Sequence, residues 1–199
     1  MSRIRECGTG QVIYGPEYPS TSIYLLVAGK VRISQFAADG TDVLLDIIRP
    51  EEIFGESAFL DARNVSERAT AAEMCKVMSW EVSDMEKLVS NRPRLAVALL
   101  QVFAQRNAQA ALRIASFATD TIEQRLARSL LHFSKRLGTV EPDGTERMMP
   151  LTHVLLSQYV GTSREIVTHY MTRFRNKGYV QYSRQGIVLY RNDLQNILA

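Results

Sequence analysis

The stretch 151–182 constrains the fold of this chain more than any other feature. Apolar residues recur there at helical spacing in two segments, which are separated by Gly161. Thr152 and Ser163 stand where each helix would begin, because a hydroxyl oxygen can accept a hydrogen bond from a backbone N–H of the first turn. Gly161 can adopt the positive φ of a tight turn, and Gly178 is placed to end the second helix. The pattern therefore predicts a helix-turn-helix.

The second predicted helix has a polar face opposite its apolar one. This face consists of Arg164, Glu165, Thr168, His169, Arg173 and Arg175. Side chains at the start of such a helix reach base edges, and arginines further along reach phosphates; the alternative for the last two arginines is a solvated surface. Residues 1–119 contain 13 Lys and Arg against 14 Asp and Glu, whereas residues 120–199 contain 11 against 7. A basic C-terminal part and this face together predict double-stranded DNA as a partner.

Short apolar runs separated by turn residues fill the chain from residue 10 to residue 80. Runs of this length and spacing are typical of strands in a β-barrel, roll or sandwich. The pair Asp39-Gly40 lies between two of these runs and predicts a hairpin turn. After Gly178, two further short runs flank Arg184 and predict a second hairpin, or wing.

A long helix is predicted to begin at Pro93, which suits a first helical turn. When this helix is divided into heptads, a stripe of mostly apolar residues occupies the a and d positions in alternation. This is the pattern by which two helices form a dimer seam. The stripe consists of Leu100, Phe103, Asn107, Ala110, Ile114 and Phe117. A polar Asn107 in this stripe costs stability but can fix the register and the number of helices. We expect a parallel homodimer; the alternative is a helix that packs only against its own domain.

These segments resemble one family along nearly the whole chain. The sequence TSREIVTHYMTRFRNKGYV is similar to the helix-turn-helix of the cAMP receptor protein/FNR (Crp/Fnr) family of bacterial transcription regulators. The resemblance implies an α+β fold with an N-terminal antiparallel β-roll (a cyclic-nucleotide-binding-like jelly roll), a long dimerisation helix and a C-terminal winged helix-turn-helix. The domains would be residues 1–82, 83–119 and 120–199.

The resemblance also implies roles for the polar face. Arg164 would donate to guanine O6 and N7, and Glu165 would accept from a cytosine amine. Thr168 would contact a thymine methyl group, whereas His169 stands where several relatives carry a second arginine, which leaves the base preference there open. The expected phosphate contacts are Gln158, Thr162, Ser163, Arg173 and Arg184. A dimer with two such helices would bind a roughly palindromic promoter site of about 20 base pairs.

Residues 53–71 resemble the cassette with which this family binds a cyclic nucleotide. The residues of this possible effector pocket are Gly55, Glu56, Ser57, Arg68 and Ala69. Backbone N–H groups at a helix start can bind phosphate; Glu56 would bind a ribose hydroxyl and Arg68 the phosphate charge. The alternative is that Glu56 and Arg68 form an ion pair with each other.

Three departures from the cAMP receptor proteins weaken the case for cAMP. The loop from Glu56 to Arg68 is two residues longer, and Ala69 stands where a serine is common. The threonine and serine that hold adenine align with Ala110 and Ala111, which have no hydroxyl groups. We therefore expect a regulator that is effector-independent or has an unidentified effector. The alternative is a cAMP-dependent regulator with the nucleotide in the β-roll.

Other functional classes find no support in the residues. No Ser-His-Asp, Cys-His, carboxylate–metal or P-loop arrangement can be assembled, so we expect no enzyme and no metal site. Cys7 and Cys75 are too few for a [4Fe–4S] centre, although a redox role for either thiol stays open. A nucleotide-binding module without DNA function is a further alternative, against which the basic helix-turn-helix argues.

The sequence also supports expectations about the location of the protein, its partners and its mode of regulation. The sequence shows neither an N-terminal signal peptide nor a run of about 18 apolar residues, so a cytoplasmic protein with no membrane partner is expected. The family resemblance implies RNA polymerase as a partner, with the turn at 142–144 as a candidate contact. Activation is the expected mode, and repression stays open.

Overall fold

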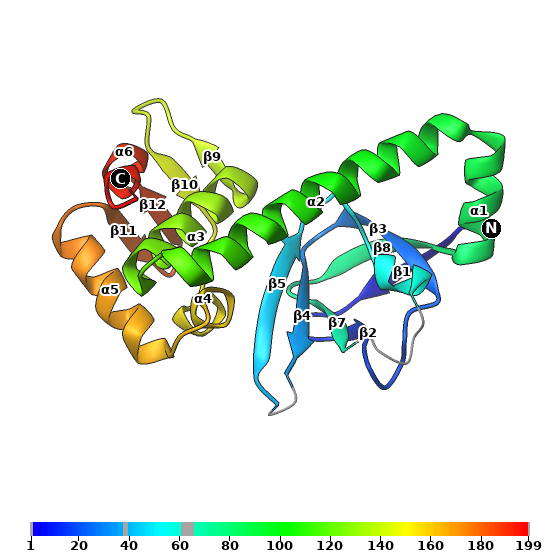
Figure 1. The fold of residues 1–199 in the computed structure, drawn as a ribbon, viewed down its shortest axis with the longest axis horizontal. Coiled ribbons are helices and arrows are strands. Elements are labelled where there is room, and N and C mark those ends of the chain that lie inside the picture. Colours follow the sequence, from blue (N-terminus) through cyan, green and yellow to red (C-terminus); the bar gives the residue numbers. More distant parts are fainter. Residues whose placement is uncertain (1, 38–39, 61–65, 199) are drawn as a thin grey trace. The chain divides into compact units, whose positions relative to one another are not determined.

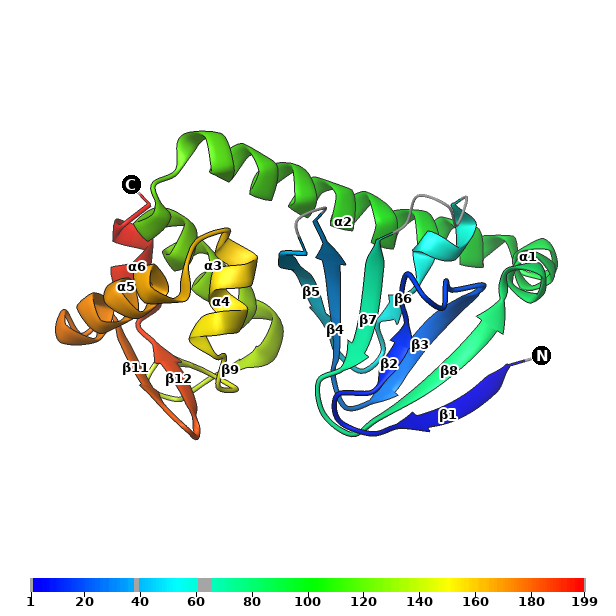
Figure 2. The same ribbon diagram turned by 90° about the horizontal axis from the view of Figure 1, so that it is seen from below.

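The computed structural model describes residues 2–37, 40–60 and 66–198. The chain forms two compact units, residues 1–107 and residues 108–199, and the boundary lies within helix α2 (Pro93–Thr119). Figure 1 and Figure 2 show the elements of each unit from two directions. Asp39 of the expected hairpin turn lies outside the described residues, although the strands on either side of it pair with one another.

Two antiparallel sheets build the first unit, and Figure 2 shows them facing one another. The sheet with order β1-β8-β3-β6 consists of β1 (Arg3–Cys7), β8 (Cys75–Glu81), β3 (Ser22–Ala28) and β6 (Ile53–Phe54). The sheet with order β2-β7-β4-β5 consists of β2 (Val12–Tyr14), β7 (Glu67–Ala71), β4 (Val31–Phe36) and β5 (Asp42–Ile48). Because side chains alternate between the faces of a strand, one face of each sheet supplies the core. Leu26 of β3 and Ile33 of β4 belong to the same buried cluster, and the predicted β-roll is confirmed.

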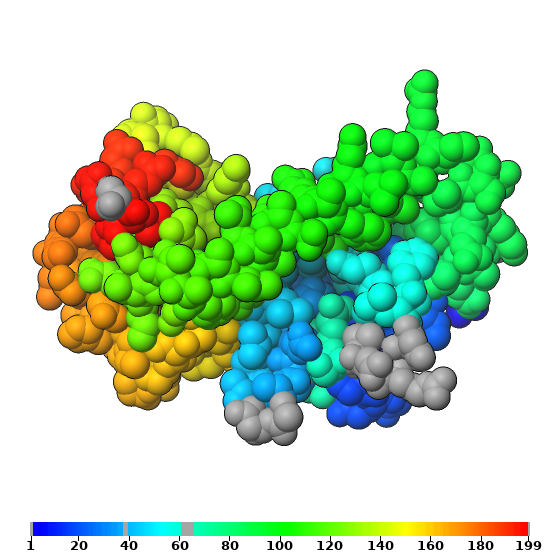
Figure 3. All heavy atoms as spheres, in the orientation of Figure 1, coloured from blue at the N-terminus to red at the C-terminus, as the bar shows by residue number. Residues whose placement is uncertain are grey.

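Helices complete this unit and lead out of it. The 3₁₀ helix η1 (Glu56–Phe59) follows β6, and α1 (Val82–Asn91) follows β8. Helix α2 begins at Pro93 as predicted, because proline lacks the N–H group that a first turn leaves unbonded. Figure 3 shows α2 as an exposed ridge. Its exposed apolar side chains include Leu100, Ile114 and Phe117.

The second unit joins helices to a small sheet of order β11-β12-β10-β9. Its helices are α3 (Ile122–Leu137), α4 (His153–Val160), α5 (Arg164–Asn176) and α6 (Arg191–Asn196). Its strands are β9 (Gly138–Val140), β10 (Glu146–Met148), β11 (Val180–Ser183) and β12 (Gly186–Leu189). Leu130 of α3, Leu156 of α4 and Met171 of α5 are fully buried where these helices pack together. The arrangement confirms the predicted winged helix-turn-helix.

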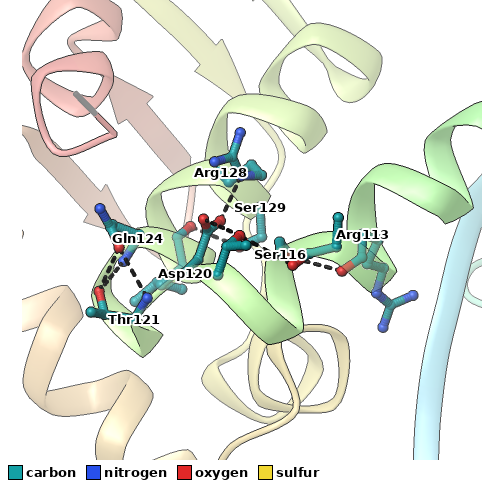
Figure 4. A network of polar contacts seen from close by, with 10 residues as sticks. Arg113, Ser116, Asp120, Thr121, Gln124, Arg128 and Ser129 are labelled. Atoms are coloured by element: carbon teal, nitrogen blue, oxygen red, sulfur yellow. Dashed lines mark hydrogen bonds and ion pairs between the residues drawn. The ribbon is translucent and has the colours of Figure 1, made fainter.

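The junction between α2 and α3 is fixed by local hydrogen bonds, which Figure 4 shows. The Thr121 hydroxyl accepts from the Gln124 backbone N–H at 3.3 Å, and the Gln124 side chain accepts from the Thr121 N–H at 3.0 Å. This reciprocal pair is a capping box, which satisfies two N–H groups at the start of α3. Asp120 accepts from Arg128 Nε at 2.8 Å, and this contact holds the pKa of the Asp120 carboxyl below its usual value. The new helix therefore starts at a defined residue directly after α2.

Candidate nucleic-acid interface

The turn between α4 and α5 forms as the sequence predicts. The Thr152 hydroxyl accepts from Leu155 N at 3.1 Å, and the Ser163 hydroxyl accepts from Ile166 N at 3.3 Å. Gly161 has φ 73°, and a Cβ placed there would lie 2.9 Å from Cε1 of Phe117. Two separate requirements, a left-handed backbone and a close ring, therefore select glycine at this position.

One face of α5 anchors the helix and leaves the other face accessible. Val167, Met171 and Phe174 are fully buried, at the spacing of one face of a helix. The opposite face is exposed at Arg164, Glu165, Thr168, His169 and Arg173. An open groove of about 460 Å³ runs along it, lined by Thr168, His169, Thr172, Arg173, Asn176 and Lys177. The predicted base-reading residues thus lie on one accessible helix face.

Arg164 and Glu165 occupy the first turn of α5, where both side chains are exposed. The Glu165 backbone N–H and the Ser163 side chain hold the pKa of the Glu165 carboxyl below its usual value. The carboxylate is therefore ionised at neutral pH and can only accept hydrogen bonds. A guanidinium donor next to a carboxylate acceptor presents the complementary chemistry of a guanine and a cytosine edge.

Two polar groups on this face are already engaged within the protein. Arg173 Nη1 lies 3.2 Å from Glu123 Oε2, so α3 holds part of its charge. The Thr168 hydroxyl lies 2.8 Å from His153 Nδ1 and donates to Arg164 O at 2.9 Å. A phosphate would compete with Glu123 for Arg173, whereas the Thr168 oxygen has two partners before any DNA arrives.

Three of the remaining predicted phosphate contacts, Gln158, Thr162 and Ser163, precede α5 in the chain, and the fourth, Arg184, lies in the wing. Ser163 is exposed, while Gln158 and Thr162 are half-buried. Arg184 is exposed in the turn that joins β11 to β12, where Gln185 N donates to Ser183 Oγ at 3.1 Å. The geometry places these groups where the sequence predicts, and their contacts with phosphate stay predictions.

The effector cassette in the first unit has a different set of partners from the one expected. Glu56 accepts from Arg106 Nη1 at 2.6 Å, and Arg106 also donates to the backbone carbonyl of Ile53. Arg68 pairs instead with Glu17, at 3.1 Å. The alternative of an ion pair between Glu56 and Arg68 is therefore wrong, because each residue pairs with an oppositely charged neighbour from another part of the unit. Arg106 is the residue of this site that the sequence analysis missed.

The Arg68 guanidinium retains capacity for an anion. It lies 4.4 Å from the centre of the Phe36 ring, and its Nε atom is buried without a partner among the described residues. A buried donor without an acceptor is costly, and a phosphate oxygen could supply one. Ala69, in contrast, is fully buried in the core cluster, and Gly55 has φ 85° with the Tyr24 ring against it. Among the cassette residues, Arg68 is thus the one with a free donor that an anionic group could satisfy.

A buried carboxyl lies beside the cassette. Glu67 Oε1 accepts from the Tyr14 hydroxyl at 2.6 Å and from the Ser57 hydroxyl at 3.2 Å. Burial raises the pKa of Glu67 above its ordinary value of 4.5, and the charge of Glu56 adds to this rise, while the two hydrogen bonds oppose it. The folded state therefore binds this proton more tightly than the unfolded state does. The resulting stabilisation is complete below about pH 4.5 and is lost as the pH rises through the folded-state pKa.

The substitution Glu67→Gln is expected to stabilise the first unit at neutral pH. The glutamine oxygen can accept the same two hydrogen bonds without a buried charge. Urea unfolding should show a higher free energy of unfolding than wild type at about pH 7, and the difference should shrink toward about pH 4. Glu6→Gln, which makes the same change at an exposed position of β1, is the control. A difference between Glu67→Gln and wild type that does not change with pH would contradict this account.

Among the described residues, no group of three or more His, Cys, Asp or Glu side chains is arranged to hold a metal ion. None of the described helices has the length and apolarity that crossing a bilayer requires.

Cys7 and Cys75 are opposite one another on β1 and β8, and both thiols are free and buried. Burial raises the pKa of the Cys75 thiol to about 11, and the neighbouring Cys7 adds to this rise. A thiol of this kind is mostly protonated at neutral pH and reacts slowly.

Comparison with known families gives two matches along the chain. The cyclic nucleotide-binding domain family matches residues 4–92, and the Crp-like helix-turn-helix domain family matches residues 124–197. These ranges fall on the β-roll with α1 and on the helices and sheet that carry the polar face of α5.

Individual proteins agree with these matches. The chain is 27% identical over 180 residues to the CRP-like cAMP-activated global transcriptional regulator of Mycobacterium tuberculosis, over 90% of this chain and 80% of that protein. It is 26% identical over 191 residues to the global nitrogen regulator of Synechococcus elongatus, over 94% and 86%.

Solved structures show the same architecture. FixK2 from Bradyrhizobium japonicum superposes with a TM-score of 0.84 at 22% identity and covers 99% of this chain and 97% of its own. TTHA1359, a transcriptional regulator of the CRP/FNR family from Thermus thermophilus, gives a TM-score of 0.76 at 26% identity, with 98% and 97% covered.

Proposed function

We propose that this chain, which belongs to the Crp/Fnr family of DNA-binding transcription regulators, acts as a homodimer on a palindromic promoter site. The observation that carries the proposal is the first turn of α5. Arg164 and Glu165 are exposed there, directly after a Ser163 cap that fixes where the helix begins. Buried side chains on the other face hold the helix in place, so these two groups can enter a major groove as a fixed pair.

The dimer is supported by the surface of α2. Leu100 and Ile114 are 66% and 70% exposed in the single chain, and they lie two heptads apart on one helix. Leaving large aliphatic side chains in water is unfavourable, and a second copy of the helix would bury them. In the proposed division of roles, residues 1–82 form the sensor, residues 83–119 the dimerisation segment and residues 120–199 the DNA-binding domain.

We propose further that the dimer binds DNA without an effector or with an unidentified one. The glutamate of the cassette is already neutralised by Arg106, and two hydroxyl groups that would hold adenine are absent. The cAMP-dependent alternative is supported by the buried Nε atom of Arg68 and by the Mycobacterium tuberculosis relative, which is cAMP-activated by name. If cAMP binds, Arg68 would hold its phosphate and Glu56 its ribose.

RNA polymerase is the proposed second partner, and activation the proposed mode. The turn at 142–144 between β9 and β10 is exposed, which a polymerase contact requires. Asp143 accepts from Thr145 N at 2.9 Å and from Thr145 Oγ1 at 2.7 Å. These bonds fix the shape of the turn. They are also sufficient reason for an aspartate and a glycine at this position if the turn contacts no polymerase.

Selection of operators from random duplexes, with and without cAMP, tests the proposed function. We expect recovery of an inverted repeat whose half-sites lie about one helical turn apart, equally in both conditions. Recovery only with cAMP would show that the alternative is right and that the first unit is a nucleotide sensor. Failure to recover any repeat in either condition would contradict the proposal of an effector-independent regulator. Arg68→Ala, selected in parallel, shows whether any effect of cAMP runs through the cassette.

A further inference from the structure

The hydroxyl group of Thr168 has a fixed hydrogen-bond arrangement before DNA binds. Its oxygen lies 2.9 Å from the backbone carbonyl of Arg164 and 2.8 Å from Nδ1 of His153. A hydroxyl has one hydrogen, and a carbonyl oxygen can only accept. Both contacts are therefore satisfied only when Thr168 donates to the carbonyl and His153 Nδ1 carries a proton and donates to Thr168. The geometry assigns the Nδ1–H form to His153.

The imidazole ring is held by elements other than α5. His153 is the first residue of α4, and its ring meets the edge of Tyr182 from β11 at 5.6 Å and 68°. The Arg175 guanidinium lies 5.2 Å from the centre of the same tyrosine ring. Burial lowers the pKa of His153 below its ordinary value, and the charge of Arg164 lowers it further, so the ring is neutral at pH 7. The hydroxyl of Thr168 is thus fixed by a half-buried group that the wing supports.

This arrangement decides which part of Thr168 can meet a base. Threonine in a helix divides between two side-chain rotamers, because its oxygen can bond to a carbonyl one turn back. The hydrogen bond with His153 gives the Thr168 oxygen a second partner in the rotamer that bonds to the Arg164 carbonyl, and so favours that rotamer. Thr168 itself is exposed on the accessible face of α5. Because its hydrogen is donated to the Arg164 carbonyl and one lone pair is bound to His153, the hydroxyl can no longer donate to a base and keeps a single acceptor position. The methyl group is then the main group that Thr168 offers to DNA, and it can contact the methyl of thymine.

We propose that His153 is a positioning residue for base recognition: it holds the Thr168 hydroxyl so that Thr168 selects thymine through its methyl group. This inference rests on the proposed function, since it assumes that α5 enters the major groove. Without His153, the hydroxyl can turn toward a base edge. A threonine hydroxyl bonds to more than one kind of base, so selectivity at that position then falls.

Operator selection with three kinds of variant separates the roles of hydroxyl, methyl and imidazole. His153→Ala should lower the preference for thymine at one position of each half-site by about fourfold, the factor that burial of one methyl group supplies. His153→Asn should restore it, because an amide N–H can donate from nearly the place of Nδ1. Thr168→Val should keep the preference, and should keep it even in combination with His153→Ala. Thr168→Ser should lose it although His153 is present.

The outcomes distinguish this inference from the proposed function. Absence of any operator for the wild type would overturn both. A wild-type operator whose thymine preference is unchanged in His153→Ala, or unchanged in Thr168→Ser, would overturn the inference alone. If His153→Ala fails to fold, Thr168→Ser can still overturn the inference, because an unchanged thymine preference in this variant would show that the methyl group is not read. Nitrogen-15 spectra of the free protein give an independent measurement: His153 should show the Nδ1–H form at neutral pH, and the Nε2–H form would overturn the inference.

Discussion

Arg164→Ala is expected to lower affinity for the selected operator by about 1–3 kcal/mol for each half-site and to relax base choice at one position of that half-site. The reason is that a guanidinium can donate two parallel hydrogen bonds to guanine O6 and N7, and alanine offers none. A symmetric dimer loses this contact twice. Titration of labelled operator at fixed salt concentration measures the affinity, and operator selection with the variant measures the loss of specificity.

Two further variants separate base recognition from charge. Arg164→Lys keeps the charge but not the planar pair of donors, so it should recover part of the affinity and little of the specificity. Arg94→Ala removes an exposed arginine from the first turn of α2, outside the DNA-binding unit, and should leave base choice unchanged. If Arg164→Ala bound its operator as selectively as wild type, the assignment of Arg164 to a base would be wrong.

Ile114→Asp should separate the dimer into monomers. Burying an isoleucine side chain contributes about 1.5–3 kcal/mol, and a parallel pair of helices buries one from each copy. The substitution removes both contributions and sets two carboxylates against each other in the seam. The dissociation constant should therefore rise by more than about a hundredfold. Sedimentation equilibrium measures this change, and binding to the full palindrome should fall to the affinity for one half-site.

Leu112→Asp is the matched control for this prediction. Leu112 is two residues away on the same helix and is 69% exposed, close to the 70% of Ile114. In the heptad frame it lies at position f, on the side opposite the seam, where a charge is compatible with a dimer. The two variants should therefore differ in oligomeric state although the chemical change is similar. Equal sedimentation of both variants, whether as dimers or as monomers, would argue against this seam.

Phe117, the last residue of the seam, is close to the turn before α5 as well as being exposed to a second copy. A Cβ placed at Gly161 of the same chain would lie 2.9 Å from this ring, and the ring centre lies 5.1 Å from the Arg125 guanidinium carbon, yet the residue is 44% exposed. The same ring can therefore pack against the turn before α5 and against a second copy. We expect substitutions here to alter DNA binding and dimerisation together, whereas Ile114→Asp acts on dimerisation first.

Local chemistry in the sequence determined where the DNA-binding helices begin and turn. The capping residues Thr152 and Ser163 and the left-handed Gly161 all act on backbone groups within a few residues. Such interactions depend little on the rest of the fold, so a short stretch of sequence is enough to predict them. The short apolar runs of the strands and the proline at the start of α2 were predictable for the same reason.

Only the tertiary structure decided which distant side chains meet. The strand β1 escaped the sequence analysis because Arg3, Arg5 and Glu6 give it a polar, exposed character, and its pairing with β8 is what makes it a strand. No local pattern reveals that Glu56 pairs with Arg106, 50 residues away, or that His153 bonds to Thr168. Charges and hydroxyl groups have many potential partners along a chain, and packing selects among them. The sequence by itself therefore determined the family and the reading helix, while the fold decided which of its polar groups remain available to DNA.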